Sequence, residues 1–168
     1  MAFHVKKPTA PQAAQPPAAK PAQRASRSRK QLHDGVFMLS LIYDDNPLEV
    51  IKTLRGGTPA SVVPELAQRL GISQDGLFDI LGLARSTIKN RISTKGNLAP
   101  AEQDRIYRAD RVWSRTLQVL EDETAARTWI TRSNRTLGGE VPLALLDTDF
   151  GYELVLDTLG RIEYGIVS

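Results

Sequence analysis

Residues 66–92 read LAQRLGISQDGLFDILGLARSTIKNRI, and this stretch decides the fold class. Leu66 and Leu70 recur at helical spacing up to Gly71, and the apolar residues that follow form two further short groups separated by Gly82. A glycine directly after a helical pattern favours a left-handed helix end. The stretch therefore predicts three short helices joined by tight turns, which is the arrangement of a helix–turn–helix.

The last of the three helices has the composition of a DNA-contacting surface. Residues 84–95 contain four basic residues and no acidic one, and Ile88 and Ile92 occupy the side that faces the core. In a helix–turn–helix, the second helix of the pair, here the last of the three, places its N-terminal residues at base edges of the major groove. There an arginine can form two hydrogen bonds with guanine, and an asparagine can form two with adenine. The alternative is a three-helix packing unit with a solvated basic face. The predicted DNA-binding residues are Arg85, Ser86, Lys89, Asn90 and Arg91.

Helix signals continue on both sides of this motif. Pro47 starts a short amphipathic pattern that ends at the glycine pair 56–57. Ser73 is the predicted N-cap of the middle helix of the motif, and Asp122 and Thr148 are predicted N-caps of two later helices. The apolar run at 36–43 fits a buried strand or a buried helix turn equally well. Because no alternating strand pair follows it, the predicted fold class is mainly α, a helix–turn–helix bundle followed by a small helical domain.

The helix that follows Pro100 is the longest predicted element. Its apolar residues form one narrow stripe, and its arginines lie on the opposite side. We expect two surface ion pairs along this helix, Glu102 with Arg105 and Asp104 with Arg108. The stripe comprises Ile106, Ala109, Trp113, Leu117 and Leu120, and the basic side comprises Arg108, Arg111 and Arg115.

Charge is distributed unevenly along the chain. The 168 residues carry a net charge of +3, but residues 1–35 contain seven basic residues and one acidic residue, a net charge of +6. Residues 8–22 are almost all proline, alanine, glutamine and lysine, and proline denies helices and sheets their hydrogen bonds. We predict a disordered basic arm over 1–35 that either lies on DNA phosphates or is a solvated tail.

The other end of the chain has the opposite character. Residues 140–168 contain six acidic residues and one basic residue, a net charge of −5, which makes a poor surface for DNA. They are also rich in leucine. This apolar content either fills a core against the long helix or forms a protein-binding patch.

Composition excludes several function classes. The chain has no cysteine and only two histidines, His4 and His33, which leaves almost nothing for a thiol nucleophile, a His-based triad or a multi-histidine metal site. Asp147 and Asp149 are candidates for catalytic carboxylates, but acids at a helix start more often stabilise the helix. We therefore expect no enzyme, no cofactor and no metal. No apolar run approaches the roughly 20 residues of a membrane span, so we expect a cytoplasmic protein.

Three stretches match the pattern of a known family. They are ARSTIKNRI at 84–92, NLAPAEQDRIYRADRVW at 97–113 and AARTWITRSNRTLGGEVPLALLDTDFGYELVLDTLGRIEYG at 125–165. On these residues the chain resembles the Xre/MbcA/ParS antitoxin family, whose members are the partners of RES-domain toxins. It departs from the family pattern at Ala99, where a serine cap is common, and at 132–134, where a proline is common.

The resemblance implies an antitoxin of a type II toxin–antitoxin system. Its C-terminal domain would cover the active site of a RES-domain toxin that acts on NAD, and its helix–turn–helix would repress the shared promoter as a homodimer on an inverted repeat of operator DNA. A wedge carrying Glu163 and apolar neighbours would complement a basic pocket. The residues predicted to bind the toxin are Trp129, Gly138, Gly139, Pro142, Leu143, Arg161, Ile162, Glu163, Tyr164 and Gly165.

The predicted organisation has three parts. Residues 1–35 form the basic arm, and residues 36–120 form an N-terminal helical region with the helix–turn–helix at about 61–95 and the long linking helix. Residues 121–168 form the toxin-binding domain. The alternative function is a stand-alone helix–turn–helix transcriptional regulator whose C-terminal domain dimerises or senses a ligand.

Overall fold

A computed structural model describes residues 47–165, which belong to one compact unit. The predictions for the basic arm at 1–35 and for the apolar run at 36–43 lie outside the described residues. Every regular element between 47 and 165 is a helix, which confirms the mainly α fold class. None of these described helices is long and apolar enough to cross a membrane.

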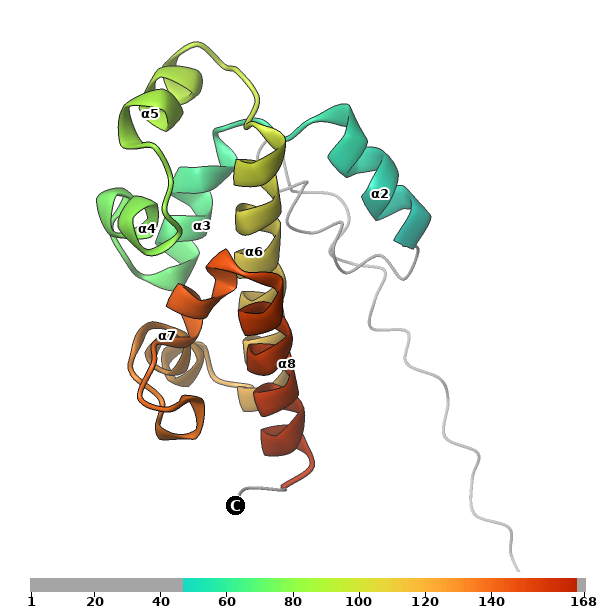
Figure 1. Cartoon of the computed structure of the whole chain (residues 1–168), viewed down its shortest axis with the longest axis vertical. Helices are drawn as coiled ribbons and strands as arrows, with labels where there is room; N and C mark the ends of the chain where they lie inside the picture. The colour runs from blue at the N-terminus through green and yellow to red at the C-terminus, as the bar shows by residue number, and fades with distance from the viewer. Residues whose placement is uncertain (1–46, 166–168) are drawn as a thin grey trace, which may run out of the picture. The chain divides into compact units, whose positions relative to one another are not determined.

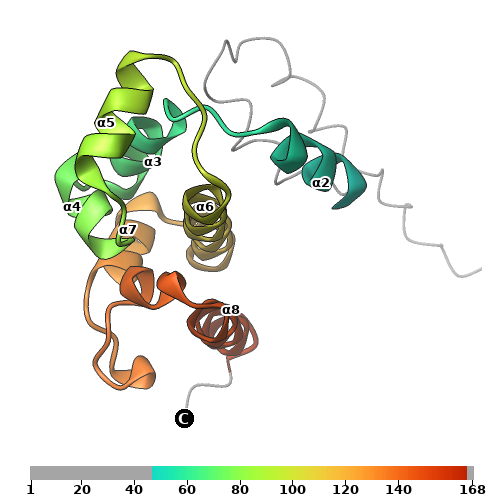
Figure 2. The ribbon, with the colours of Figure 1, turned by 45° about the horizontal axis from the view of Figure 1, so that its top comes forward.

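The described elements are joined by short connections, and most of them lie along α6, whereas α2 extends to one side (Figure 1). In chain order they are α2 (Pro47–Gly56), α3 (Val62–Leu70), α4 (Gln74–Ile80), α5 (Arg85–Ser93), α6 (Pro100–Leu120), α7 (Glu123–Thr131), the 3₁₀ helices η2 (Arg135–Leu137) and η3 (Pro142–Asp147), and α8 (Asp149–Glu163). α6 packs against α3, α7, α8 and η3. In Figure 2, where α6 is seen nearly end-on, α3 to α5 and α8 lie on different sides of it.

The helix ends predicted from the sequence are confirmed. Gly71 ends α3 with a left-handed φ of 70°. Each of the three predicted N-caps accepts a hydrogen bond from a backbone N–H within the first turn of its helix, which satisfies a donor that the helix itself leaves unpaired. These caps are Ser73 for α4, Asp122 for α7 and Thr148 for α8.

α6 begins without a side-chain cap. Ala99 has no oxygen to offer the helix, but the Glu102 carboxylate accepts a hydrogen bond from the backbone N–H of Ala99 at 2.7 Å. This contact is one half of a capping box. The departure from the family pattern at Ala99 therefore leaves the start of α6 with one of its two usual capping bonds.

α6 is buried over a wider surface than the predicted stripe. Ile106, Ala109 and Trp113 are buried as expected, and Leu117 and Leu120 are partly buried. Three further positions on α6 that lie outside the stripe have almost no exposed surface. They are Asp110, Val112 and Thr116. α6 thus serves as the central support of both halves of the described chain.

One of the two ion pairs predicted along α6 is wrong. Arg108 does pair with Asp104. Glu102, however, pairs with Arg91 of α5, and Arg105 donates to backbone carbonyls of the turn before α5. The helical spacing of Glu102 and Arg105 permits a weak surface pair, but tertiary packing brings other partners to both side chains.

Candidate functional site

The first candidate surface is the exposed side of α5. Ile88 is fully buried and fixes the helix on the core. Gly82 turns the chain with a φ of 60°, and Leu83 inserts into the core just before α5 begins. Four of the five predicted DNA-binding residues are exposed on the first two turns of the helix. These four residues, Arg85, Ser86, Lys89 and Asn90, are called the α5 face below.

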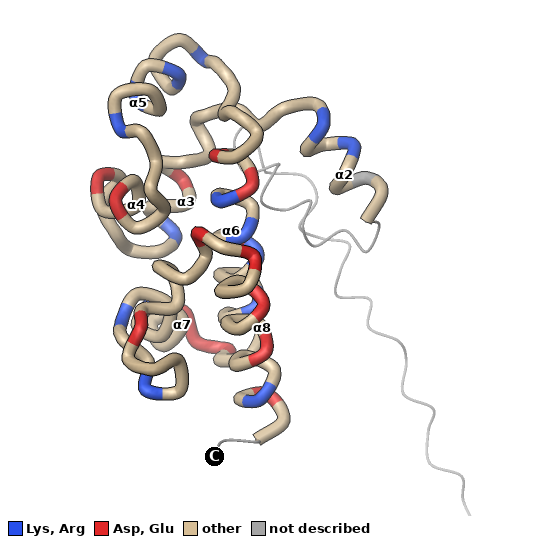
Figure 3. The backbone as a smooth tube through the Cα atoms, in the orientation of Figure 1, with Lys and Arg blue, Asp and Glu red and all other residues tan. Residues whose placement is uncertain are grey.

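Two acidic residues of α4 pair with the bases of the α5 face. Both carboxylate oxygens of Asp79 accept from Arg85 Nη2, at 2.5 and 2.6 Å. Asp75 Oδ1 lies 2.9 Å from Lys89 Nζ, and this hydrogen bond lowers the pKa of the Asp75 carboxyl. Figure 3 shows the basic positions of α5 beside the acidic positions of α4. Sequence reasoning missed these acids as partners, although Asp79 stands only six residues before Arg85.

The fifth predicted DNA-binding residue lies apart from the α5 face. Arg91 is half-buried and binds Glu102 at the start of α6. The positive charge of Arg91 is therefore largely balanced by Glu102 within the molecule. Arg91 orients α5 against α6, and it stands at the edge of the proposed DNA-binding surface.

The predicted toxin-binding residues divide by burial. Pro142 and Leu143 are buried in η3, which packs against α6, α7 and α8, and Leu143 belongs to the hydrophobic core. Trp129 and Ile162 are half-buried. The remaining six are exposed. They are Gly138 and Gly139 in the turn after η2, and Arg161, Glu163, Tyr164 and Gly165 at the end of α8.

The exposed side of α8 carries large apolar residues, two of which, Phe150 and Leu154, were not among the predicted toxin-binding residues. Phe150 is 78% exposed, Leu154 is 40% exposed and Tyr164 is 77% exposed. Large apolar side chains that face solvent together mark an interaction surface. The sequence shows that Phe150 and Leu154, four residues apart, share one side of α8, but Val155 and Leu159 have the same spacing on the opposite side. Only the structure shows that Val155 and Leu159 are the buried pair. The exposed residues Phe150, Glu153, Leu154, Asp157, Arg161 and Tyr164 are called the α8 face below.

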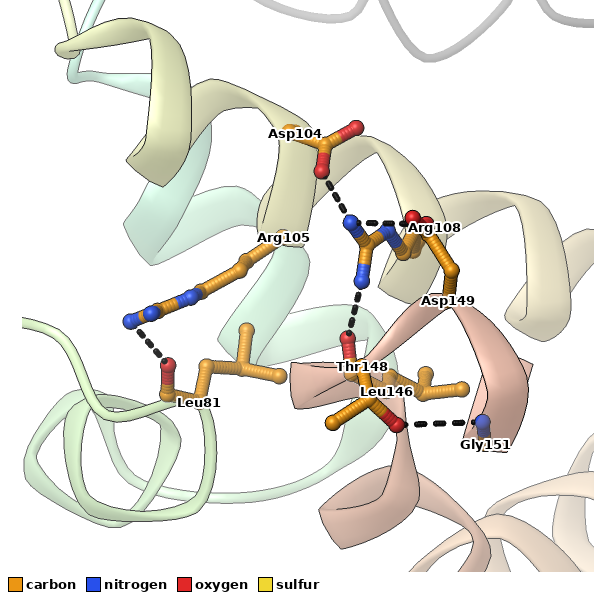
Figure 4. Close-up of polar contacts among 8 residues, drawn as sticks. All are labelled: Leu81, Asp104, Arg105, Arg108, Leu146, Thr148, Asp149 and Gly151. Atoms are coloured by element: carbon orange, nitrogen blue, oxygen red, sulfur yellow. Dashed lines mark hydrogen bonds and ion pairs between the residues drawn. The ribbon is translucent and has the colours of Figure 1, made fainter.

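Arg108 ties α8 to α6. Its Nη1 donates to the Leu146 carbonyl at 3.3 Å, and its Nη2 lies 3.0 Å from Asp149 Oδ1 (Figure 4). Only 12% of the Arg108 side chain is exposed. At the other end of α8, Glu163 pairs with Arg115. The two contacts show that α8 runs beside α6 in the same direction.

Arg105 ties α6 to the helix–turn–helix. Its Nη1 donates to the Leu81 carbonyl oxygen at 3.2 Å (Figure 4) and to the Gly82 carbonyl oxygen at 2.8 Å, both in the turn between α4 and α5. Arg105 and Arg108, three residues apart on α6, thus fix the two candidate surfaces to one helix.

Comparisons with known proteins match both halves of the described chain. Residues 49–109 match the Antitoxin Xre-like helix–turn–helix domain, and residues 116–165 match the Antitoxin Xre/MbcA/ParS C-terminal toxin-binding domain. A Photorhabdus laumondii protein named Antitoxin Xre is 32% identical over 116 residues, which cover 68% of this chain and 78% of the relative. The chain belongs to the Xre/MbcA/ParS antitoxin family. It is an antitoxin with a helix–turn–helix and a toxin-binding domain.

Two further antitoxins are similar over most of their length. Antitoxin Xre of Yersinia enterocolitica is 26% identical over 120 residues, which cover 71% of this chain and 81% of the relative. A Sphingobium protein named Prs ADP-ribosylating antitoxin is 24% identical over 138 residues, which cover 77% of this chain and 87% of the relative. The matched helix–turn–helix segment ends, and the matched toxin-binding segment starts, within α6. The antitoxin therefore carries both segments on one continuous helix.

A buried carboxylate lies where α3 meets α6 in this antitoxin. Asp110 is fully buried, its Oδ1 accepts from Arg69 Nη1 at 3.1 Å, and its Oδ2 has no hydrogen-bond partner among the described residues. Burial raises the pKa of the Asp110 carboxyl to about 7, and Arg69 opposes that shift. Arg127 of α7 donates to the Arg69 carbonyl at 2.9 Å. Residues of α3, α6 and α7 thus share one polar cluster.

Proposed function

We propose that this antitoxin represses its own promoter through the α5 face and neutralises a RES-domain toxin that acts on NAD through the α8 face. The observation that carries the proposal is the opposite chemistry of two exposed surfaces attached to α6. The α5 face is basic and polar, and the α8 face combines apolar and acidic side chains. The first suits a nucleic acid and the second suits a protein.

The position of the α5 face supports a role in reading DNA sequence. Arg85 and Ser86 are the first two residues of α5, and the N-terminal residues of a recognition helix reach base edges in the major groove. A homodimer would place two α5 faces in successive grooves, so the operator would be an inverted repeat with half-sites about one helical turn apart. The test is binding to a duplex of the shared promoter and to a scrambled duplex of the same length. Equal affinity for the two duplexes contradicts this part of the proposal.

The chemistry of the α8 face supports a protein partner with a basic pocket. Phe150, Leu154 and Tyr164 supply apolar area, and Glu153 and Asp157 supply negative charge beside it, although Asp157 also pairs with Arg161 of the same face. A pocket that binds the pyrophosphate of NAD needs positive charge, which these acids would complement. The relative named Prs ADP-ribosylating antitoxin supports a toxin that handles ADP-ribose. The exposed Gly138, Gly139, Glu163 and Gly165 extend the proposed toxin-binding surface.

A matched pair of variants tests the toxin-binding surface. Leu154 on α8 and Ile51 on α2 are exposed by 40% and 42%, so Leu154→Asp and Ile51→Asp place the same charge at equally exposed sites. Each variant is co-expressed with the protein encoded by the neighbouring reading frame, which we expect to be the RES-domain toxin. Cell growth, cellular NAD and co-purification of the two proteins are measured.

We expect Leu154→Asp to lose neutralisation and co-purification, because a charge in the centre of the α8 face opposes burial against the toxin. Ile51→Asp should behave like the wild-type antitoxin. Full protection of cells by Leu154→Asp, with the toxin still bound, contradicts the assignment of the α8 face.

The remaining parts of the proposal concern the whole chain. The antitoxin performs no catalysis of its own and acts in the cytoplasm, where its operator lies. Residues 1–35 serve as a basic arm, residues 36–120 as the DNA-binding region and residues 121–168 as the toxin-binding domain. These assignments follow the charge distribution and the two family matches.

A further inference from the structure

The contact between Asp79 and Arg85 has an unusual geometry for an exposed pair. Asp79 lies near the end of α4, and Arg85 is the first residue of α5. Both oxygens of the Asp79 carboxylate bind one nitrogen, Arg85 Nη2. Within the described chain no hydrogen bond engages Nη1 or Nε of Arg85. The acid therefore holds one corner of the guanidinium and leaves its other donors available.

This geometry matters because a guanidinium is planar. Holding Nη2 restricts the rotation of the plane, and the donors that remain point away from the acid. Recognition of guanine needs two donors of one arginine aligned with O6 and N7 of the base. An arginine that is already oriented loses less conformational entropy on forming these two bonds.

We propose that Asp79 is a positioning residue that sets the DNA-sequence specificity of this antitoxin by orienting Arg85. The proposal rests on the proposed function, since it requires the α5 face to read DNA. Asp79 itself adds negative charge beside the phosphates, which lowers affinity for every sequence. Its contribution is therefore to discrimination between base pairs and not to overall affinity.

The neighbouring pair supplies an internal control. Asp75 pairs with Lys89 at 2.9 Å, and an ammonium group is a compact charge with three rotating donors. Asp75 can neutralise Lys89, but it cannot fix a plane. Replacing Asp75 removes the same charge from the same helix without disturbing a planar donor.

The experiment uses the full chain and a duplex DNA library with a randomised core. The library is enriched by binding in parallel to the wild-type protein and to five variants, and the bound DNA is sequenced. The variants are Asp79→Asn, Asp79→Glu, Asp75→Asn, Arg85→Ala and the double variant Asp79→Asn with Arg85→Ala. Circular dichroism and Tm confirm that each variant is folded, which we expect because exposed ion pairs contribute little to stability.

The wild type should select guanine at one position of each half-site by about tenfold or more, the discrimination that a forked arginine provides. Asp79→Asn should reduce that preference at least about threefold at the same position and bind scrambled DNA more tightly. Asp75→Asn should also bind scrambled DNA more tightly but keep the preference. In the Arg85→Ala background, Asp79→Asn should change the preference no further.

The outcomes separate this proposal from the function on which it rests. A wild-type chain that enriches no sequence contradicts the proposed function itself. A wild type with a guanine preference that Asp79→Asn retains overturns the role of Asp79 alone. Equal loss of the guanine preference in Asp79→Asn and Asp75→Asn also overturns it. The loss would then come from removing a negative charge and not from releasing the Arg85 guanidinium. Recovery of the preference in Asp79→Glu, which keeps the carboxylate, supports the role.

Discussion

The α5 face and the α8 face differ in how many residues anchor their helix in the core and in whether their exposed side chains already have partners. α5 has one fully buried residue, Ile88, whereas α8 buries Gly151, Val155, Thr158 and Leu159 along its length. The two bases of the α5 face already have acidic partners on α4, but the large side chains of the α8 face remain exposed. DNA phosphates can replace an acidic partner, while exposed apolar surface gains free energy only when another surface covers it.

The difference indicates two modes of binding. On the α5 face, Lys89 exchanges its ion pair with Asp75 for a phosphate contact, while Arg85 keeps its pair with Asp79, so the net gain of the face is modest and depends on salt. The α8 face gains from burial of apolar area, which salt does not weaken. The following predictions test this contrast, from the largest expected effect to the smallest.

The largest effect is expected where α8 meets η3. A Cβ at Gly151 would lie 2.0 Å from the Leu145 carbonyl oxygen, so Gly151→Ala should displace α8 and lower the free energy of unfolding by about 3 kcal/mol or more. Gly160→Ala is the matched control, because nothing lies within 4 Å of that Cβ and alanine favours a helix by up to about 1 kcal/mol. Urea unfolding measures both. Equal stability of the two variants contradicts the close approach of α8 to η3.

A smaller effect is expected from the buried Asp110. Because burial raises the pKa of its carboxyl to about 7, the folded state keeps a proton that the unfolded chain releases near pH 4. Protonated Asp110 therefore contributes its whole share of the unfolding free energy below pH 4, and this contribution is lost as the pH rises to about 7. Between pH 5 and pH 8, the wild type should lose about 2 kcal/mol of unfolding free energy relative to Asp110→Asn, whose amide does not titrate.

Urea unfolding of both proteins at several pH values measures the difference. Asp104→Asn is a useful control, since Asp104 is an exposed acid on the same helix. A constant difference between wild type and Asp110→Asn across this pH range contradicts a raised pKa. The result also bears on the comparison of the two faces, because Asp110 joins α6 to α3 of the helix–turn–helix.

The smallest effect is expected from the basic arm. If the seven bases of residues 1–35 contact phosphates, deleting those residues should reduce the slope of log K against log salt by about 0.9 for each phosphate that the arm neutralises. The same deletion should leave toxin binding unchanged, because that binding depends on the α8 face. Fluorescence anisotropy over a salt series measures the slope. An unchanged slope assigns the arm to a solvated tail.

Local features of the fold were predictable, and the reason is their short range. The caps at Ser73, Asp122 and Thr148 and the left-handed end at Gly71 each depend on residues within one turn. Periodicity likewise located the helices, because each buries one side against the core. Such signals lie within a few residues of one another in the sequence.

The candidate surfaces were predictable only in part. Arg91 was assigned to the DNA-binding face, yet Glu102, eleven residues away, draws it toward α6. Pro142 and Leu143 were assigned to the toxin-binding surface from the family pattern, yet they are buried. Phe150 and Leu154 were missed, because helical spacing alone does not say which of two apolar sides of a helix meets the core.

The sequence by itself determined that this protein is helical, that it carries a helix–turn–helix and that its charge changes sign along the chain. These properties follow from residue spacing and composition. Only the tertiary structure decided which bases are paired, which apolar residues remain exposed and how one helix joins the two surfaces. The contacts of Arg105 with the Gly82 carbonyl and of Arg108 with the Leu146 carbonyl span 23 and 38 residues. No local sequence pattern predicts contacts between residues so far apart in the chain, because these contacts form only when the helices pack around α6.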